Sequence, residues 1–267
     1  MSATEPKPHR PFAVITGASS GIGREIADLL AEEGYDLLVC AEDDAIVNVL
    51  PPVPDVDVQS LQADLSTYDG VADLVEAVGE RDVDVLVLNA GIAVGGDFVT
   101  TALDDDLELI GVNVTAVVHL AKRLLPRMVA AGRGRLLFTG SVTSMLPGPY
   151  YATYSASKAF VLNFAESIRY ELRDSGVTVT TMMPGPTDTE FFDRAGMEDT
   201  RVGQSDSKDD PADVARDGVA AMLAGKDNAV VGSTVKNTLM SRASKALPER
   251  AKAAFQARLT EPQDERD

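Results

Sequence analysis

The sequence predicts a doubly wound α/β fold, with a parallel sheet and helices on both of its faces. Apolar runs of strand length recur along the 267 residues, and most of them are continuous rather than alternating. Continuous apolar runs are typical of strands that are buried on both faces of a parallel sheet. Segments with helical periodicity lie between these runs, and right-handed crossovers place such helices on both sides of the sheet.

Seven runs have the length and composition of buried strands. They are residues 12–16, 36–40, 56–61, 83–88, 135–139, 177–183 and 229–231. Apolar residues at a spacing near 3.6 predict helices between the strands, most clearly over 24–33, 107–128 and 161–172. The alternation of strand and helix therefore predicts a single sheet of seven parallel strands.

Proline marks two of the connections between these elements. Pro51 and Pro52 follow the segment 45–50 and cannot continue a helix, so we expect only one or two helical turns in the second crossover. The polar run 203–210 predicts a mobile loop, and Pro211 after it predicts the start of a helix.

The chain shows no internal repeat and no shift of composition that would mark a second domain. We expect a flexible N-terminal head at 1–10, one folded domain over 11–232, and a C-terminal extension at 233–267. The length is sufficient for one large core.

The net charge excludes one class of function. Asp and Glu number 42 against 24 Lys and Arg, a formal charge of −18, which repels phosphate backbones and excludes a general nucleic-acid role. No run approaches the roughly 20 apolar residues that span a bilayer, and the polar N-terminus lacks a signal-peptide core. With Cys40 as the single cysteine, we expect a cytoplasmic protein without a membrane span or a metal site.

A glycine-rich turn follows the first predicted strand. Residues 16–23 read Thr-Gly-Ala-Ser-Ser-Gly-Ile-Gly and lead directly into a helical pattern. Glycines let the backbone approach a pyrophosphate closely, and the free N–H groups of the following helix bind the anion. The alternative is a tight turn without a ligand, but the strand-turn-helix context favours a dinucleotide.

A tyrosine and a lysine lie four residues apart at the start of a predicted helix. This spacing places Tyr154 and Lys158 on one face. An ammonium near a phenol favours the phenolate, so we expect a lowered pKa and proton exchange with an alcohol or carbonyl oxygen. Tyr150 and Tyr151 have no lysine four residues further on. Taken alone, the pair is more often a surface helix contact.

The ordered combination of these motifs resembles the short-chain dehydrogenase/reductase superfamily. It comprises the turn 16–23, Asn89-Ala90-Gly91, Ser141, the Tyr154/Lys158 pair and Pro184-Gly185, and it covers about residues 11–232. The resemblance implies a Rossmann-like sheet of seven parallel strands, a nicotinamide dinucleotide cofactor, and an oxidoreductase acting on a carbonyl or secondary alcohol.

The resemblance assigns roles to four residues at the reacting centre. Tyr154 is similar to the family's general acid/base, and Lys158 to the residue that lowers its pKa and holds the nicotinamide ribose. Ser141 resembles the donor that orients the substrate carbonyl. Asn113 lies in an apolar helix stripe; it is either an amide at a local bend or, as in the family, the holder of a water on the proton path to the lysine.

Further residues are expected at the cofactor by resemblance. Asp64 matches the acceptor for the adenine amino group, although it also suits a helix cap or turn. Asn89 matches a residue that stabilises the central strands, and Thr189 one near the nicotinamide carboxamide. The full set of expected cofactor residues is Gly17, Ser19, Ser20, Gly21, Ile22, Gly23, Glu42, Asp64, Leu65, Asn89, Ala90, Gly91, Tyr154, Lys158, Pro184, Gly185, Thr187 and Thr189.

The residues after the second strand favour NAD over NADP. Glu42, Asp43 and Asp44 follow Ala41 there, and carboxylates repel a 2′-phosphate but accept a hydrogen bond from a 2′-hydroxyl. NADP stays open, because Ala41 stands where NAD-dependent members often carry Asp, and because Arg24 could reach a phosphate.

The expected substrate is a hydrophobic ketone or secondary alcohol. The loop after Ser141 and the segment after Pro184 supply Met145, Tyr150, Phe191 and Phe192, which suggest an apolar pocket or, equally, core packing. The alternatives are an NADP-dependent ketone reductase of the same family and a non-catalytic nicotinamide sensor or scaffold.

The C-terminal extension is locally basic in an acidic chain. Six Lys and Arg against Glu249 lie within 232–259, and Ala251, Phe255 and Leu259 recur at helical spacing. We interpret the segment as a pair of surface helices or, alternatively, as a basic surface that docks on another subunit or at a membrane. The resemblance implies a homodimer or homotetramer, commonly formed through the helices that carry Asn113 and Tyr154.

Overall fold

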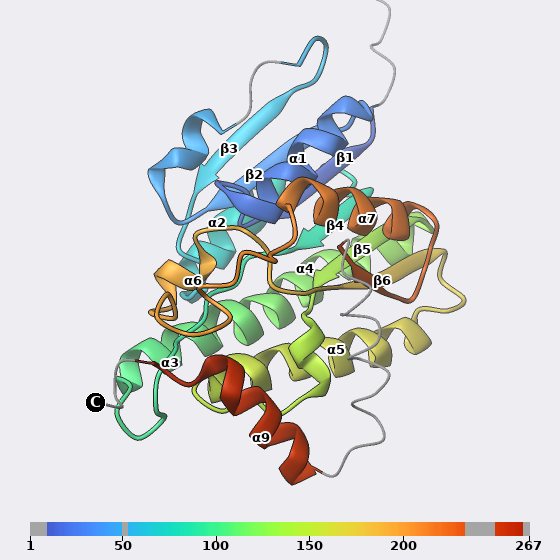
Figure 1. The fold of residues 1–267 in the computed structure, drawn as a ribbon. Helices are drawn as coiled ribbons and strands as arrows, with labels where there is room; N and C mark the ends of the chain where they lie inside the picture. Colours follow the sequence, from blue (N-terminus) through green and yellow to red (C-terminus); the bar gives the residue numbers. More distant parts are fainter. Residues whose placement is uncertain (1–9, 50–52, 233–248, 264–267) are drawn as a thin grey trace, which may run out of the picture.

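The sheet has seven parallel strands, as the sequence predicts. The computed structural model describes residues 10–49, 53–232 and 249–263. The strands lie in the order β3-β2-β1-β4-β5-β6-β7 (Figure 1). Their bounds are β1 Phe12–Thr16, β2 Asp36–Ala41, β3 Val58–Gln62, β4 Val85–Leu88, β5 Gly134–Thr139, β6 Val177–Pro184 and β7 Asn228–Val231. The fold is a single Rossmann-like domain, and the sequence-based prediction of its class is confirmed.

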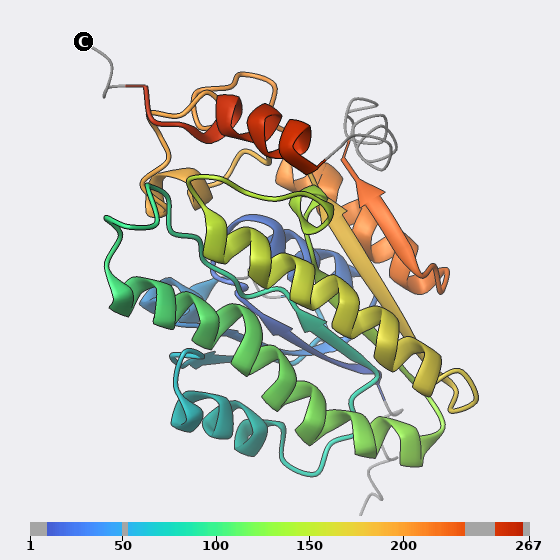
Figure 2. The ribbon, with the colours of Figure 1, turned by 90° about the horizontal axis from the view of Figure 1, so that it is seen from below.

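Helices cover both faces of this sheet (Figure 2). On one face lie α1 (Gly21–Glu32) and α7 (Pro211–Leu223), and on the other lie α2 (Tyr68–Val78), α4 (Ala116–Ala131) and α5 (Ala152–Glu171). The shorter helical elements are η1 Asp44–Asn48, α3 Leu103–Ile110, η2 Gly111–Thr115, η3 Val142–Met145, α6 Phe191–Arg194 and α9 Glu249–Thr260.

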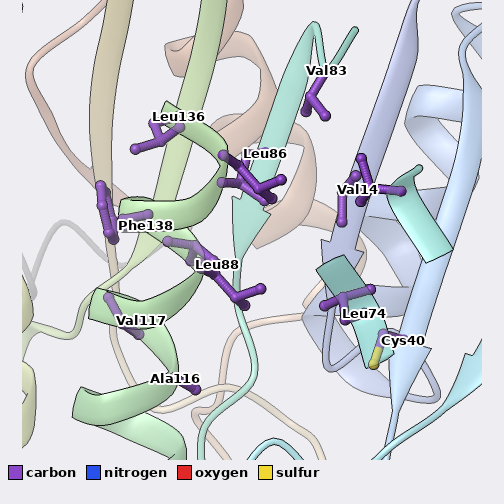
Figure 3. Packing of buried hydrophobic residues seen from close by; sticks show 14 of the residues in the cluster. Val14, Cys40, Leu74, Val83, Leu86, Leu88, Ala116, Val117, Leu136 and Phe138 are labelled. Atoms are coloured by element: carbon purple, nitrogen blue, oxygen red, sulfur yellow. The ribbon is translucent and has the colours of Figure 1, made fainter. Parts of the chain in front are cut away.

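The core is divided into two layers because successive strand residues point to opposite faces of the sheet. Val14, Leu86 and Phe138 belong to the layer that packs with α2, α4 and α5. The close-up shows the strand residues of this layer with Leu74 of α2 and with Ala116 and Val117 of α4 (Figure 3). Ala13 and Ile15 point the other way and pack with α1 and α7. The five inner strands are therefore largely buried on both sides, which explains their continuous apolar runs, whereas the edge strands β3 and β7 are partly exposed.

The order of strands reverses beside β1, and this position determines where a ligand can bind. β1 pairs with β2 on one side and with β4 on the other. In an open parallel sheet, the crevice beyond the carboxyl ends of the strands at this reversal is the usual binding site. The glycine turn follows β1 directly and therefore lies at this crevice.

The helical run Leu103–Ala131 is long and apolar enough, by length and composition, to cross a membrane. Its apolar residues Ala116, Val117 and Leu120 are buried against the sheet. Core packing therefore accounts for the apolar character of this run.

The connections agree with the proline pattern, but one loop is more constrained than expected. The described part of the second crossover contains the short 3-10 helix η1, while Pro51 and Pro52 lie outside the described residues. Helix α7 begins at Pro211, and its N-cap Asp210 accepts a hydrogen bond from the Ala212 N–H at 2.8 Å. The predicted mobile loop is fixed at its end, where the Asp209 N–H donates to the Pro186 carbonyl at 2.8 Å and Asp209 is buried.

Candidate active site

One large pocket lies at the carboxyl ends of the strands. Its volume is about 1020 Å³, at the upper end of the roughly 300–1,000 Å³ of small-molecule sites, so it has room for a dinucleotide and a substrate together. All of the residues that the sequence suggested for the cofactor line it. They are Gly17, Ser19, Ser20, Gly21, Ile22, Gly23, Glu42, Asp64, Leu65, Asn89, Ala90, Gly91, Tyr154, Lys158, Pro184, Gly185, Thr187 and Thr189.

The glycine turn forms one wall of this pocket, and its glycines are required by geometry. Gly17 and Gly21 have φ values of 65° and 54°, a region that L-residues with a side chain rarely adopt. A Cβ on Gly23 would collide with the carbonyl oxygen of Gly17. The turn therefore brings the N-terminus of α1, with its free N–H groups and positive dipole, to the pocket wall, where it can bind a phosphate.

Asn89 ties the glycine turn to the neighbouring strands. Its Nδ2 donates to the carbonyl oxygens of Thr16 and Gly17 at 3.1 and 3.0 Å, and its Oδ1 accepts from the Thr139 hydroxyl at 3.0 Å. The amide joins the ends of β1, β4 and β5. It therefore fixes the shape of the pocket floor.

Acidic side chains line the pocket beyond β2 and β3. Asp43 accepts a hydrogen bond from the Ser19 hydroxyl at 2.7 Å and lies 3.9 Å from Arg194, and Glu42 lies beside it. Burial and the nearby carboxylates, Asp64 first among them, raise the pKa of Glu42. Asp64 itself accepts from the Ser66 N–H at 2.8 Å, so it forms a local turn before α2 and lines the pocket as well.

Tyr154, Lys158 and Ser141 meet at the inner end of the pocket. Helix α5 carries the tyrosine and the lysine one turn apart, and Ser141 caps η3 directly after β5. The Lys158 Nζ donates to the Thr139 carbonyl at 2.9 Å and lies 5.8 Å from the centroid of the Tyr154 ring. Tyr154 and Lys158 are only 9% and 5% exposed.

Burial changes the pKa of both groups. It raises the pKa of Tyr154 to about 12, although a hydrogen bond with Ser141 acts in the opposite direction. It lowers the pKa of Lys158 to about 8. The sequence predicts that the lysine lowers the pKa of the tyrosine; the direction in this structure is the reverse, because loss of water on burial dominates. Tyr154 is therefore a protonated phenol near neutral pH.

Asn113 lies behind the pocket rather than in its lining. It is at the centre of η2, a π-helical turn between α3 and α4. Its Oδ1 accepts from the Ile92 N–H, and its Nδ2 donates to the Ile92 carbonyl and to the Ser157 hydroxyl, each at 2.9 Å. A Cβ on Gly91 would lie 3.1 Å from the Lys158 Nζ and 3.3 Å from the Asn113 Oδ1, so the amide and the lysine both adjoin this glycine.

The remaining wall of the pocket is largely apolar. Phe191 and Phe192 line it, and the ring centroid of Phe191 lies 5.3 Å from that of Tyr154. Met145 and Tyr150, which we expected here, are not among its lining residues. The further apolar side chains in the wall are Val142, Leu146, Met197, Val202, Phe255 and Leu259.

Two features of the pocket were absent from the sequence-based expectations. Tyr151 lines the pocket, and its ring centroid lies 5.8 Å from that of Tyr154. The sequence gives no signal for this residue, because it has no lysine four residues further on. Helix α9 also lines it, through Phe255, Gln256, Leu259 and Thr260. The apolar spacing of Ala251, Phe255 and Leu259 signals a helix but not its position. Most of the basic segment, 233–248, lies outside the described residues, as does most of the predicted head.

The arrangement supports proton transfer to an oxygen that gains charge. The Ser141 hydroxyl and the Tyr154 phenol can both act on one carbonyl oxygen, and the groove from the glycine turn leads to them. Within residues 10–49, 53–232 and 249–263, no group of three or more His, Cys, Asp or Glu side chains could hold a metal ion.

Comparison with known proteins identifies close similarity in sequence and structure. Residues 11–199 match the family model described as short chain dehydrogenase. A Drosophila melanogaster protein named dehydrogenase/reductase SDR family protein 7-like is 34% identical over 184 residues, which cover 64% of this chain and 56% of that protein. The chain thus spans little more than half of that relative.

Two solved structures have the same fold. A short-chain dehydrogenase from Sphingobium yanoikuyae in complex with NADPH has a TM-score of 0.79 at 28% identity, covering 96% of this chain and 98% of that one. A short chain dehydrogenase/reductase from Burkholderia phymatum in complex with NAD has a TM-score of 0.77 at 23% identity, with coverage of 96% and 98%. The second likeness concerns the fold alone.

Proposed function

Because the chain belongs to the short-chain dehydrogenase/reductase family of NAD(P)-dependent oxidoreductases, we propose that it reduces an apolar ketone with Tyr154 as the general acid. The reverse reaction oxidises the secondary alcohol. The observation that carries this proposal is that Tyr154, Lys158 and Ser141 converge, largely buried, in the pocket that the glycine turn also lines.

The proposed step follows from the positions of these side chains. The Ser141 hydroxyl donates to the substrate carbonyl, which polarises the C=O bond and orients it toward Tyr154. The nicotinamide, when bound, supplies the hydride that adds to the carbonyl carbon. The phenolic proton of Tyr154 passes to the oxygen, so that a ketone becomes an alcohol and the tyrosine is left as a phenolate.

Lys158 and Asn113 support this step without supplying the hydride or the first proton. The ammonium of Lys158 stabilises the phenolate that remains on Tyr154, because it is held in the same buried region by the Thr139 carbonyl. Asn113 fixes Ile92 and Ser157 around the lysine. A protonated phenol near neutral pH suits the donation of a proton to the substrate oxygen.

The residues around Tyr154 support an apolar substrate. Phe191, Phe192 and Leu146 line the pocket near the reacting centre, and Met197 and Val202 continue the apolar wall. Burial of apolar surface contributes roughly 25 cal/mol per Å², so a bulky hydrophobic ketone gains affinity here that a small polar ketone does not. A panel of steroid, acyl and aromatic ketones, assayed by oxidation of the reduced cofactor, tests this expectation.

The carboxylates beyond β2 support NAD(H) as the preferred cofactor. Glu42 and Asp43 line the pocket, and the guanidinium of Arg194 is already paired with Glu190 at 2.7 Å and with Asp43 at 3.9 Å. A 2′-phosphate would therefore meet two carboxylates beside an arginine that is already paired. Steady-state kinetics with both cofactors decide this point: a higher kcat/KM with NADPH would overturn the preference, and the alternative is an NADP-dependent reductase.

A non-catalytic nicotinamide sensor is the second candidate, and the acid/base group separates the two. A sensor needs the glycine turn but has no use for a buried Tyr154 beside Lys158 and Ser141. Cofactor binding without turnover of any ketone in the panel would favour the sensor.

Exposed apolar side chains support self-association. Leu103 and Leu107 on α3, Val118 on α4 and Phe160 on α5 are exposed. These helices are adjacent on one face of the sheet (Figure 2). A homodimer or homotetramer formed through this face would bury them, and light scattering measures the mass that this predicts. The described part of the basic extension, α9, instead lies against the pocket of its own chain.

A further inference from the structure

The C-terminal helix α9 closes the substrate end of the pocket. The Thr260 hydroxyl donates to the Pro149 carbonyl at 2.8 Å, and the Val202 N–H donates to the Leu259 carbonyl at 3.1 Å. The Tyr150 hydroxyl donates to the Glu261 carboxylate at 3.1 Å. Both ribbon views place α9 beside the segment that leads into α5 (Figures 1 and 2). The helix is therefore attached directly beside Tyr151 and one turn from Tyr154.

One polar side chain of α9 lines the pocket without a hydrogen-bond partner among the described residues. Gln256 is 4% exposed and lines the pocket, yet its amide forms no hydrogen bond with any residue in the described parts of the chain. Thr260, one turn further on the same face, is equally buried but has its hydroxyl satisfied by Pro149. The amide is not among the fully buried, unpaired polar atoms of the described residues, so it is open to the pocket, where a polar group of a ligand can bond to it.

We propose that Gln256 selects substrates that carry a second, uncharged hydrogen-bonding group at a distance from the reacting carbonyl. This inference rests on the proposed ketone reduction. A primary amide offers two donor hydrogens and one acceptor oxygen, which suit a hydroxyl or a second carbonyl. Phe255 and Leu259 of the same helix line the pocket with it and add apolar surface. The substrate class is thus an apolar ketone with one additional hydroxyl or carbonyl group.

The reacting centre and Gln256 face different parts of the ligand. Tyr154 is on α5, whereas Gln256 lines the pocket from α9, which is attached at Pro149, five residues before Tyr154. A site built to hydrogen-bond a substrate group discriminates strongly against an analogue that lacks it, because the buried amide is then left unpaired.

Matched ketones on one carbon skeleton test the inference. We would measure kcat/KM for 4-phenylcyclohexanone and for 4-(2-, 3- or 4-hydroxyphenyl)cyclohexanone, with the wild type, Gln256→Leu and the control Arg258→Leu. Arg258 is an exposed residue of the same helix and does not line the pocket. The wild type should prefer at least one hydroxylated ketone by roughly 10-fold or more, mainly through KM.

The variants separate the inference from the proposed function. Gln256→Leu should lose this preference, so that its kcat/KM for the hydroxylated ketone falls to about that for the unsubstituted ketone, while Arg258→Leu should retain the wild-type ratio. A wild type that reduces all four ketones equally, or a Gln256→Leu variant that keeps the preference, overturns the role of Gln256 alone. A wild type that reduces none of these ketones or of the wider panel overturns the proposed function as well.

Discussion

Lys158 should make the stability of the protein without cofactor depend on pH in a specific direction. Burial lowers its pKa from 10.5 to about 8. Below pH 8 both the folded and the unfolded chain carry the proton, and the folded state bears the cost of a buried ammonium. Between pH 8 and 10.5 the unfolded lysine stays protonated while the folded one loses its proton. The unfolded state then binds more protons, so stability rises with pH across this window.

The size of the effect follows from the difference between the two pKa values. At about 1.4 kcal/mol per pKa unit, the free energy of unfolding should rise by ~3 kcal/mol from this lysine alone. Other groups also titrate, so the quantity to compare is the wild type minus Lys158→Met at each pH. Urea denaturation at intervals from pH 7 to 10.5 measures it.

The control for this experiment is Lys122→Met, which removes a positive charge from the exposed side of α4. It corrects for the loss of one cation from a chain with a formal charge of −18. A difference between wild type and Lys158→Met that stays constant from pH 7 to 10.5, or that falls, would refute the reasoning that burial controls this lysine.

Three further predictions follow from contacts at the site. Replacing Glu42 and Asp43 by Gln and Asn should raise the ratio of kcat/KM with NADPH to kcat/KM with NADH by roughly 10-fold, because the change removes charge that repels a 2′-phosphate. An unchanged ratio would mean that these carboxylates do not select the cofactor. Asn113→Leu should lower the free energy of unfolding by ~3 kcal/mol, because the loss of three hydrogen bonds leaves their buried partners unpaired. Urea denaturation measures this change. Thr260→Val should raise KM for bulky ketones several-fold with little change in kcat, because it removes the bond from α9 to Pro149.

The elements that the sequence predicts best are those set by local pattern. The strands follow from continuous apolar runs, and the glycine turn follows from residues whose φ values and close contacts exclude a side chain. The one-turn spacing of Tyr154 and Lys158 is equally local. For this reason the sheet and the glycine turn could be expected from local pattern, whereas the wider set of pocket residues could be expected only from the family resemblance.

The features that escaped prediction depend on packing between distant segments. The direction of the Tyr154 pKa depends on how much water the whole pocket excludes, which no pair of residues reveals. Asn113 could be read as a bend or as part of a proton path, and the structure shows a π-turn whose amide ties together Ile92 and Ser157. The apolar spacing in α9 shows a helix, but its position against Pro149 depends on a contact across 111 residues.

Tyr154→Phe tests the central claim most directly, with Tyr151→Phe as the matched control. Both phenols are buried in the same pocket, but only Tyr154 is assigned the proton transfer. The measurement is kcat for the best ketone of the panel, together with cofactor affinity by fluorescence. We predict that Tyr154→Phe lowers kcat by roughly 10²-fold or more with cofactor affinity nearly unchanged, while Tyr151→Phe retains most of the wild-type rate. Wild-type turnover by Tyr154→Phe would contradict the account.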